Sequence, residues 1–133
     1  MKSILLSDSV EQLHAVYAKE TVEFLQEQAG LDSACLTSED IRRDPARYRE
    51  VRYLFSTWGC PAFSEEELAA LLPSLECVFY AAGSVQSFAR PYLHRGIRVF
   101  SAWAANAVPV AEYTTAQILL ANKGFFAASR HYS

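Results

Sequence analysis

The order of the predicted elements between residues 75 and 123 constrains the fold of this chain more than any other feature. An apolar strand at 76–81 leads into a turn with Gly83, a short helix, a second strand at 97–101, a polar loop and a long apolar helix. A helix that connects two consecutive strands of one sheet makes them parallel, with a right-handed crossover. This stretch therefore predicts an α/β protein built on a parallel sheet.

The same alternation of strand and helix extends back to the N-terminus. Short apolar runs predict three further strands at Lys2–Leu6, Ser33–Thr37 and Arg52–Thr57. Residues 38–50 are charged and irregular, with a short helix expected from Pro45. Five strands separated by helices predict a flavodoxin-like, doubly wound parallel sheet with helices on both faces.

Capping signals mark the ends of two predicted helices. Ser9 with Gln12, and Ser64 with Glu67, have the spacing of a capping box, in which the two side chains bond each other's backbone amides. Gly30 suits the left-handed position that ends a helix. We therefore expect one helix between Ser9 and Gly30 and another that begins after Ser64.

The last predicted helix is apolar around most of its circumference. Proline suits the first turn of a helix, so we expect Pro109 to open this one. The chain then divides into a flavodoxin-like substrate domain at 1–108 and an interdomain helix at 109–133. A helix that is apolar on every side must be buried on every side. One sheet covers one side, so we expect a second copy of the chain, or an absent cofactor domain, to cover the other.

The charge distribution argues against a nucleic-acid partner. The net charge is −3 and the isoelectric point is near 5.6. Neighbouring acidic residues offset the one cluster of arginines, which favours a solvated face over a phosphate-binding patch. That cluster contains Arg42, Arg43, Arg47, Arg49 and Arg52.

Targeting, membrane and metal signals are also weak. The N-terminal apolar run is shorter than the core of a signal peptide, and the apolar tract around 116–128 is too polar to span a bilayer. We therefore expect a cytoplasmic protein without membrane contact. Cys35, Cys60 and Cys77 are odd in number and lack CxxC spacing, so we expect neither a disulfide nor a metal site.

Three loops lie where open α/β sheets bind ligands, beyond the carboxyl ends of the strands: 58–61, 82–86 and 102–109. In the second, Gly83 and Ser84 directly follow a strand, and glycine lets backbone N–H groups approach an anion. Gly83 could equally be a turn glycine. In the third, Asn106 could cap the final helix or hydrogen-bond a carboxylate.

Several short elements occur in the order and with the gaps of a known family. The chain from residue 75 to residue 123 resembles the N-terminal catalytic (substrate) domain of the D-isomer-specific 2-hydroxyacid dehydrogenases. The first 74 residues fit that fold but carry no signature of the family. The matching elements are 75–84, Arg95–Val99, Asn106–Ala107, Val110–Glu112 and Ala116–Ala121.

The resemblance implies a role for several residues. Gly83 and Ser84 would lie in the loop whose amides hold the carboxylate of a 2-oxo acid. Asn106 would contact substrate or the nicotinamide end of NAD or NADP, and Val110 would pack against the nicotinamide. Glu112 would be structural. A further pair, Trp58 and Gly59, would line the cleft.

The chain also departs from the family pattern. Ser84 replaces a common second glycine, and Gln86 replaces an aspartate, although neither change removes a backbone anion site. The Arg, Glu and His that the family uses for hydride transfer belong to a second domain with a GxGxxG fingerprint. The five glycines here include no pair two residues apart, and His14, His94 and His131 are expected to be surface or packing residues. We therefore expect an N-terminal fragment or truncated form of an NAD(P)-dependent enzyme, inactive alone.

The alternative is a standalone flavodoxin-like module that binds a ligand or self-associates without catalysis. A phosphate-accepting receiver is disfavoured, because Asp8 supplies only part of its acidic cluster and the third strand ends in Ser56-Thr57-Trp58. A flavin site is disfavoured because Asp8, in the turn after the first strand, would repel a phosphate.

Overall fold

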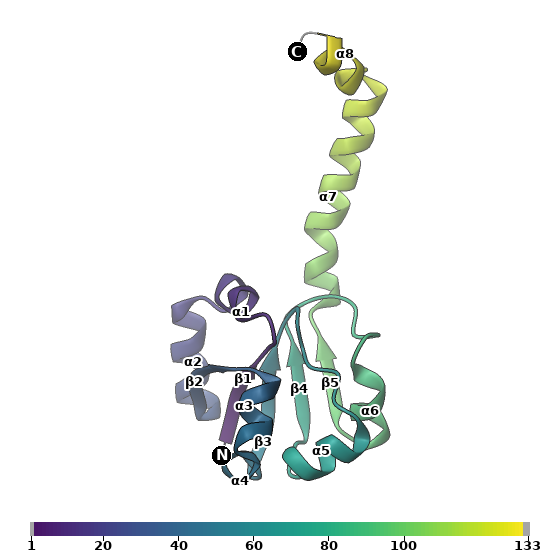
Figure 1. Ribbon diagram of the computed structural model, residues 1–133. Helices are drawn as coiled ribbons and strands as arrows, with labels where there is room; N and C mark the ends of the chain where they lie inside the picture. Colours follow the sequence, from purple (N-terminus) through teal and green to yellow (C-terminus); the bar gives the residue numbers. More distant parts are fainter. Residues whose placement is uncertain (1, 132–133) are drawn as a thin grey trace. The chain divides into compact units, whose positions relative to one another are not determined.

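The computed structural model, which describes residues 2–131, contains a sheet of five parallel strands (Figure 1). The strand order is β2-β1-β3-β4-β5, with every neighbouring pair parallel. This is the flavodoxin-like, doubly wound order, so the predicted fold class is confirmed. The strands are β1 (Lys2–Leu6), β2 (Leu31–Leu36), β3 (Val51–Ser56), β4 (Cys77–Tyr80) and β5 (Arg98–Ser101).

Helices connect the strands, and two more follow the sheet. The chain divides into two compact units, Met1–Ala102 and Trp103–Ser133. Within the described residues, no helix is long and apolar enough to cross a membrane. The first unit contains α1 (Val10–Val16), α2 (Lys19–Ala29), α3 (Ser38–Arg43), α4 (Pro45–Tyr48), α5 (Glu65–Leu71) and α6 (Ala89–His94); the second contains α7 (Trp103–Asn122) and α8 (Phe125–His131).

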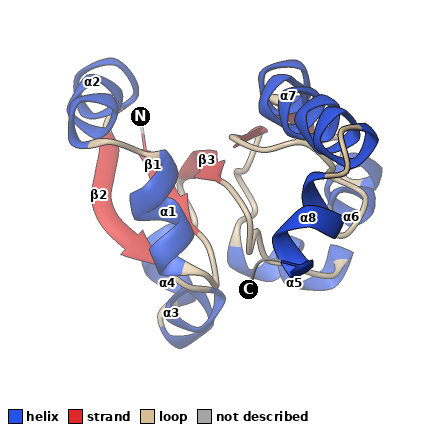
Figure 2. Cartoon of the chain, turned by 90° about the horizontal axis from the view of Figure 1, so that it is seen from above, coloured by secondary structure: helices blue, strands red, loops and turns tan. Residues whose placement is uncertain are grey.

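The helices of the first unit cover the two faces of the sheet unequally. One face packs against α3, α4, α5 and α6, and the larger core lies there, with Leu54, Val78 and Tyr92 fully or almost fully buried (Figures 1 and 2). The other face packs against α1 and α2, where Leu5, Leu13 and Phe55 form a smaller core. Successive strand residues alternate between the faces, as pleating requires.

The helix ends show which capping predictions were right. Ser64 and Glu67 form the expected capping box, and Gly30 ends α2 at φ +60°. Ser9 is the N-cap residue of α1, as predicted, but its side chain makes no cap bond, so the predicted capping box with Gln12 is absent. The single helix predicted between Ser9 and Gly30 is in fact two helices, α1 and α2, because the backbone is extended at Tyr17 and Ala18.

The segment predicted to be irregular is mostly helical. α3 begins at a capping box formed by Thr37 and Asp40. The usual pattern has Glu or Gln three residues after the cap, so it does not detect a box in which Asp40 takes that position. Hydrogen bonds from Thr37 lower the pKa of the Asp40 carboxyl. The predicted helix at Pro45 is present as α4.

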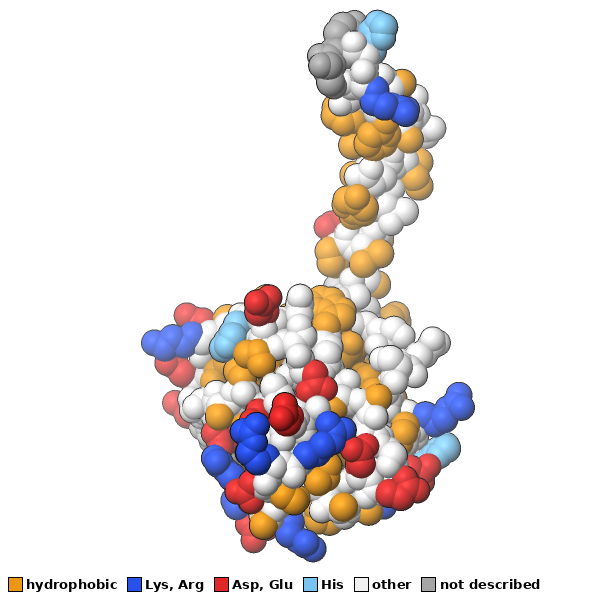
Figure 3. All heavy atoms as spheres, in the orientation of Figure 1, with side chains coloured by type: hydrophobic (Ala, Val, Ile, Leu, Met, Phe, Trp, Pro, Cys, Tyr) orange, Lys and Arg blue, Asp and Glu red, His pale blue; other side chains and the backbone are white. Residues whose placement is uncertain are grey.

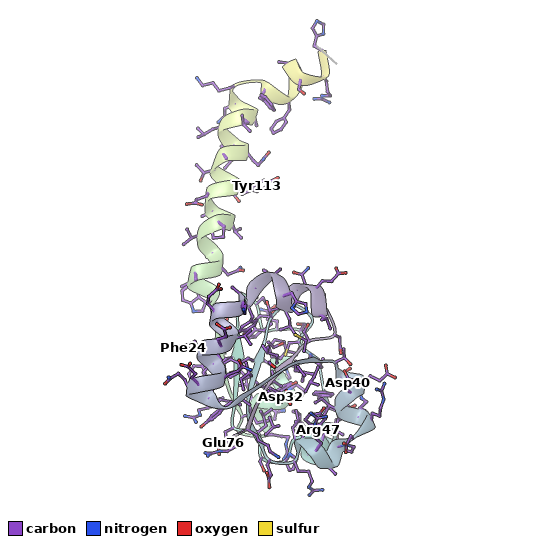
Figure 4. All side chains as sticks on the ribbon, turned by 90° about the vertical axis from the view of Figure 1, so that its left-hand side faces the viewer. Phe24, Asp32, Asp40, Arg47, Glu76 and Tyr113 are labelled. Carbon is purple, nitrogen blue, oxygen red and sulfur yellow. The ribbon has the colours of Figure 1, made fainter. Side chains whose placement is uncertain are left out.

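Exposed ion pairs account for three arginines of the cluster. Arg42 lies 2.8 Å from Glu67, and Arg52 lies 2.7 Å from Glu76. Arg47 lies 3.4 Å from Asp32, and Figure 4 labels both residues of this pair. These pairs join residues distant in sequence, on side chains that are 36–59% exposed. Exposed pairs of this kind contribute little to stability, because solvent screens the two charges.

The final helix differs from its prediction in two ways. α7 begins at Trp103, six residues before Pro109, so the proline lies inside the helix. The alanine-rich start of α7 favours helix strongly enough to extend it past the proline. None of the described residues of α7 is buried, although its composition predicts burial on every side.

Candidate functional site

The loops that follow β1, β3 and β4 meet at the carboxyl edge of the sheet. These three strands are neighbours, so their ends are adjacent. The amide of Asp8 donates to the carbonyl of Gly59 at 2.8 Å, and the amide of Ala81 donates to the carbonyl of Ser56 at 2.8 Å. The loop after β3, which contains Trp58 and Gly59, is therefore hydrogen-bonded to the loop after β1. The first residue after β4 is hydrogen-bonded to the last residue of β3.

A buried serine organises the first of these contacts. Ser7 is 0% exposed, and its hydroxyl donates to the carbonyl of Trp58 at 2.7 Å while accepting from the amide of Ser9 at 2.9 Å. Gly59 has φ +84°, and its Cα lies so close to the β1 loop that an added Cβ would be 2.6 Å from the Ser7 Oγ. The Asp8 carboxylate accepts from the amide of Ser38 at 2.7 Å. The sequence pattern did not identify Ser7, because a serine after a strand carries no distinctive spacing.

The loop after β4 contains Gly83 and Ser84. The hydroxyl of Ser101, at the end of β5, lies 2.9 Å from the carbonyl oxygen of Ala82 and 2.6 Å from that of Gly83. These bonds fix the loop through its carbonyl side. Among the described residues, the amides of Gly83, Ser84 and Val85 have no hydrogen-bond acceptor. These three successive N–H groups have no partner within the described protein and are therefore available to a ligand or to water.

Gly83 itself does not occupy the left-handed region, unlike Gly30, Gly59, Gly96 and Gly124. Backbone conformation therefore does not require glycine at this position. What the glycine provides is the absence of a side chain beside the unpaired amides. Gly83 is half-buried and Ser84 is exposed, so the loop is accessible.

Two hollows adjoin this loop. One, of about 280 Å³, lies at the ends of β4 and β5 and is lined by aromatic rings together with Ala81 and Ser101. The other, of about 550 Å³, lies beside α6 and includes Val85 and Gln86. Tyr17 lines the smaller hollow, and its hydroxyl donates to the carbonyl of Ser56 at 3.0 Å. Burial raises the pKa of Tyr17.

The structure defines the surroundings of two ionisable side chains, Cys60 and His94. Burial raises the pKa of the Cys60 thiol to about 12, which keeps it protonated and a poor nucleophile. His94 lies 2.8 Å from Glu65, in a contact between α6 and α5 that is outside the three loops. Within residues 2–131, no group of His, Cys, Asp and Glu side chains could hold a metal ion.

Asn106 and Val110 lie on α7, in the second unit. They are four residues apart and therefore share one face of the helix. Asn106 is half-buried and Val110 is 58% exposed. Because α7 begins at Trp103, Asn106 is the fourth residue of the helix and does not cap it. The predicted site residues thus lie in three places: the loop after β3, the loop after β4, and one face of α7.

Comparison with known proteins supports the fold. No family model matches the chain, and no curated protein matches it. A solved structure does: an NAD-dependent formate dehydrogenase from Staphylococcus aureus, in complex with NAD, superposes with a TM-score of 0.66 at 18% identity. The match covers 99% of this chain and 40% of the dehydrogenase, so the chain spans less than half the length of that enzyme.

Proposed function

We propose that the chain is the substrate-binding domain of an NAD(P)-dependent D-2-hydroxyacid dehydrogenase, and that it holds a 2-oxo acid by its carboxylate. The observation that carries this proposal is the run of three unpaired amides at Gly83, Ser84 and Val85, on a loop fixed by Ser101. The likeness of fold to an NAD-dependent dehydrogenase supports it. So does the resemblance of residues 75–123 to the family.

In this proposal the loop binds and orients the substrate. Hydrogen bonds from neutral amides to a carboxylate are charge-assisted and roughly twice as strong as neutral ones. Binding through the backbone leaves the 2-oxo group free to point away from the loop. Asn106 would position that group or the cofactor, Val110 would pack against the nicotinamide, and Trp58 with Gly59 would border the cleft.

The chain's own residues do not fit a dinucleotide. The turn after β1 is the place where such a fold holds a pyrophosphate. Here the amide of Asp8 already bonds Gly59 and the amide of Ser9 already bonds Ser7, while the Asp8 carboxylate would repel phosphate. We therefore assign the binding of NAD or NADP to another domain and derive no catalytic step through it.

The binding proposal predicts selectivity for the carboxylate. Titration calorimetry should detect saturable binding of pyruvate, and loss of binding for methyl pyruvate, which has the same 2-oxo group without the charge. With three hydrogen bonds and an open site, we expect a dissociation constant of roughly 1 mM, or about −4 kcal/mol. Equal binding of acid and ester would contradict the proposal.

A matched pair of variants at one position separates backbone from side chain. Ser84→Pro removes one of the three amide donors, and we expect pyruvate binding to weaken about tenfold, the loss expected for one hydrogen bond to a charged group. Ser84→Ala removes only the hydroxyl and should bind as the unchanged chain does. Circular dichroism confirms that both variants remain folded. Weaker binding by Ser84→Ala alone would assign recognition to the hydroxyl.

The proposal also predicts that the purified chain has no dehydrogenase activity. Hydride transfer needs a bound cofactor and a group that moves a proton, and the proposal assigns both to another domain. The check is NADH oxidation in the presence of pyruvate or glyoxylate, followed by absorbance. Turnover by the pure 133-residue chain, absent from a mock purification, would contradict the assignment as a binding domain.

A further inference from the structure

In the proposed function, the loop after β4 recognises an anion without a charged side chain. Residues 82–86 contain none. Figure 3 shows Lys and Arg side chains interspersed with Asp and Glu side chains over the first unit, so the face in view has no extended patch of positive charge. Recognition at this loop therefore depends on the directions in which its neutral N–H groups point. A contact that sets those directions would control binding.

Two carbonyl groups of this loop converge on one side chain. The Ser101 Oγ lies 2.9 Å from the carbonyl oxygen of Ala82 and 2.6 Å from that of Gly83. The hydroxyl has a single proton, which the two oxygens share. Among the described residues, neither carbonyl accepts a hydrogen bond from any other donor. Ala82 is only 1% exposed, so water cannot readily take the place of this hydroxyl.

The planarity of the peptide bond couples these two carbonyls to two of the amide donors. In a trans peptide unit the C=O of one residue and the N–H of the next point in opposite directions, and no described peptide bond is cis. The Ala82 carbonyl shares its unit with the N–H of Gly83, and the Gly83 carbonyl shares its unit with the N–H of Ser84. Because both carbonyls point to Ser101, both N–H groups point away from it. The N–H of Val85 belongs to the next unit, whose carbonyl Ser101 does not contact.

We propose that Ser101 is a positioning residue for the carboxylate site, and that its hydroxyl holds the N–H groups of Gly83 and Ser84 in the orientation that an anion requires. Successive N–H groups on one side of the chain form a concave anion site. Ser101 can act on this loop because it pairs with Tyr80, so the end of β5 lies beside the start of the loop. The identity of the anion rests on the proposed function, whereas the orientation belongs to the chain without ligand.

Residual dipolar couplings of the ¹⁵N-labelled chain test the orientation without any ligand, because each coupling reports the direction of one N–H bond. In Ser101→Ala the couplings of Gly83 and Ser84 should change, while those of the strands stay as they are and show that the fold is intact. Ser101→Thr keeps a hydroxyl and should restore both values. Should Ser101→Ala fail to fold, Ser101→Cys, whose thiol is a weak donor, serves in the same comparison. Unchanged couplings at Gly83 and Ser84 in the variant without the hydroxyl would overturn the proposal.

Calorimetric titration with pyruvate tests the consequence for binding. Ser101→Ala should weaken binding about tenfold, the loss expected for one hydrogen bond to a charged group, and Ser101→Thr should restore it. Thr57→Val is the matched control. The Thr57 hydroxyl lies 3.4 Å from the carbonyl of Ala81, so it reaches the same loop from β3 without contacting a peptide unit that carries one of the three donors.

The outcomes separate this inference from the proposed function. Thr57→Val should bind pyruvate as the unchanged chain does, and an equal loss in Thr57→Val and Ser101→Ala would show that binding follows the general anchoring of the loop, which would overturn the role of Ser101. If the unchanged chain does not bind pyruvate, the proposed function fails, and the dipolar couplings still decide whether Ser101 orients the two N–H groups.

Discussion

Replacing Gly59 with alanine is expected to lower the free energy of unfolding by about 3 kcal/mol, because two costs add. A residue with a Cβ pays about 1–2 kcal/mol to adopt a left-handed conformation, and Gly59 has φ +84°. The new Cβ would also lie 2.6 Å from the Ser7 Oγ and 2.8 Å from the Ser9 amide nitrogen. Displacing Ser7 leaves buried groups unpaired, at about 1–3 kcal/mol.

Gly96→Ala is the matched control for this prediction. Gly96 has a similar φ of +77°, but no heavy atom lies within 4 Å of the position that a Cβ would take. Only the conformational cost of about 1–2 kcal/mol should then appear. Urea denaturation of both variants measures the difference. Equal losses would show that the β1 and β3 loops are not in close contact at Gly59.

Truncation of Tyr92 to alanine is expected to lower the free energy of unfolding by about 3–5 kcal/mol, the range for a large buried aromatic side chain. Tyr92 is 0% exposed, packs edge to face against Phe88 at 5.7 Å, and donates its hydroxyl proton to the carbonyl of Pro61 at 2.8 Å. The residue fixes α6, and α6 directly follows the loop that contains Gly83 and Ser84.

Two further variants divide this effect into packing and hydrogen bonding. Tyr92→Phe keeps the ring but leaves the Pro61 carbonyl unpaired, which should lower the free energy of unfolding by about 1–3 kcal/mol. Leu93→Ala changes the adjacent residue, which is 55% exposed, and should change the free energy of unfolding by no more than about 0.5 kcal/mol. Thermal and urea denaturation give the values. A Tyr92→Ala variant no less stable than Leu93→Ala would contradict the packing of α6.

The fold could be predicted from the sequence because its signals are local and repeated. Short apolar runs separated by capping residues and glycines place each strand within one or two residues of its observed bounds. The start of α7 could not be predicted in the same way, because Pro109 suggests a first turn while the preceding alanines favour helix. Which of these two preferences prevails, and therefore the residue at which α7 begins, depends on the folded structure.

The site was predictable in part. Gly83 and Ser84 follow a buried strand, so the sequence placed them in the β4 loop, but it could not show that Ser101 fixes that loop from the next strand. Ser7 and Asp8 bond residues about 30 to 50 positions away, and no short pattern records such contacts. The sequence also placed Asn106 in a loop, whereas it lies within α7.

A pyruvate titration of the ¹⁵N-labelled chain, followed by NMR, tests whether the loop after β4 holds the carboxylate. The amide resonances of Gly83, Ser84 and Val85 should shift together along one saturable curve, whereas methyl pyruvate should leave them in place. Shifts confined to other parts of the chain, or none at saturating pyruvate, would contradict the claim that this loop holds the carboxylate of a 2-oxo acid.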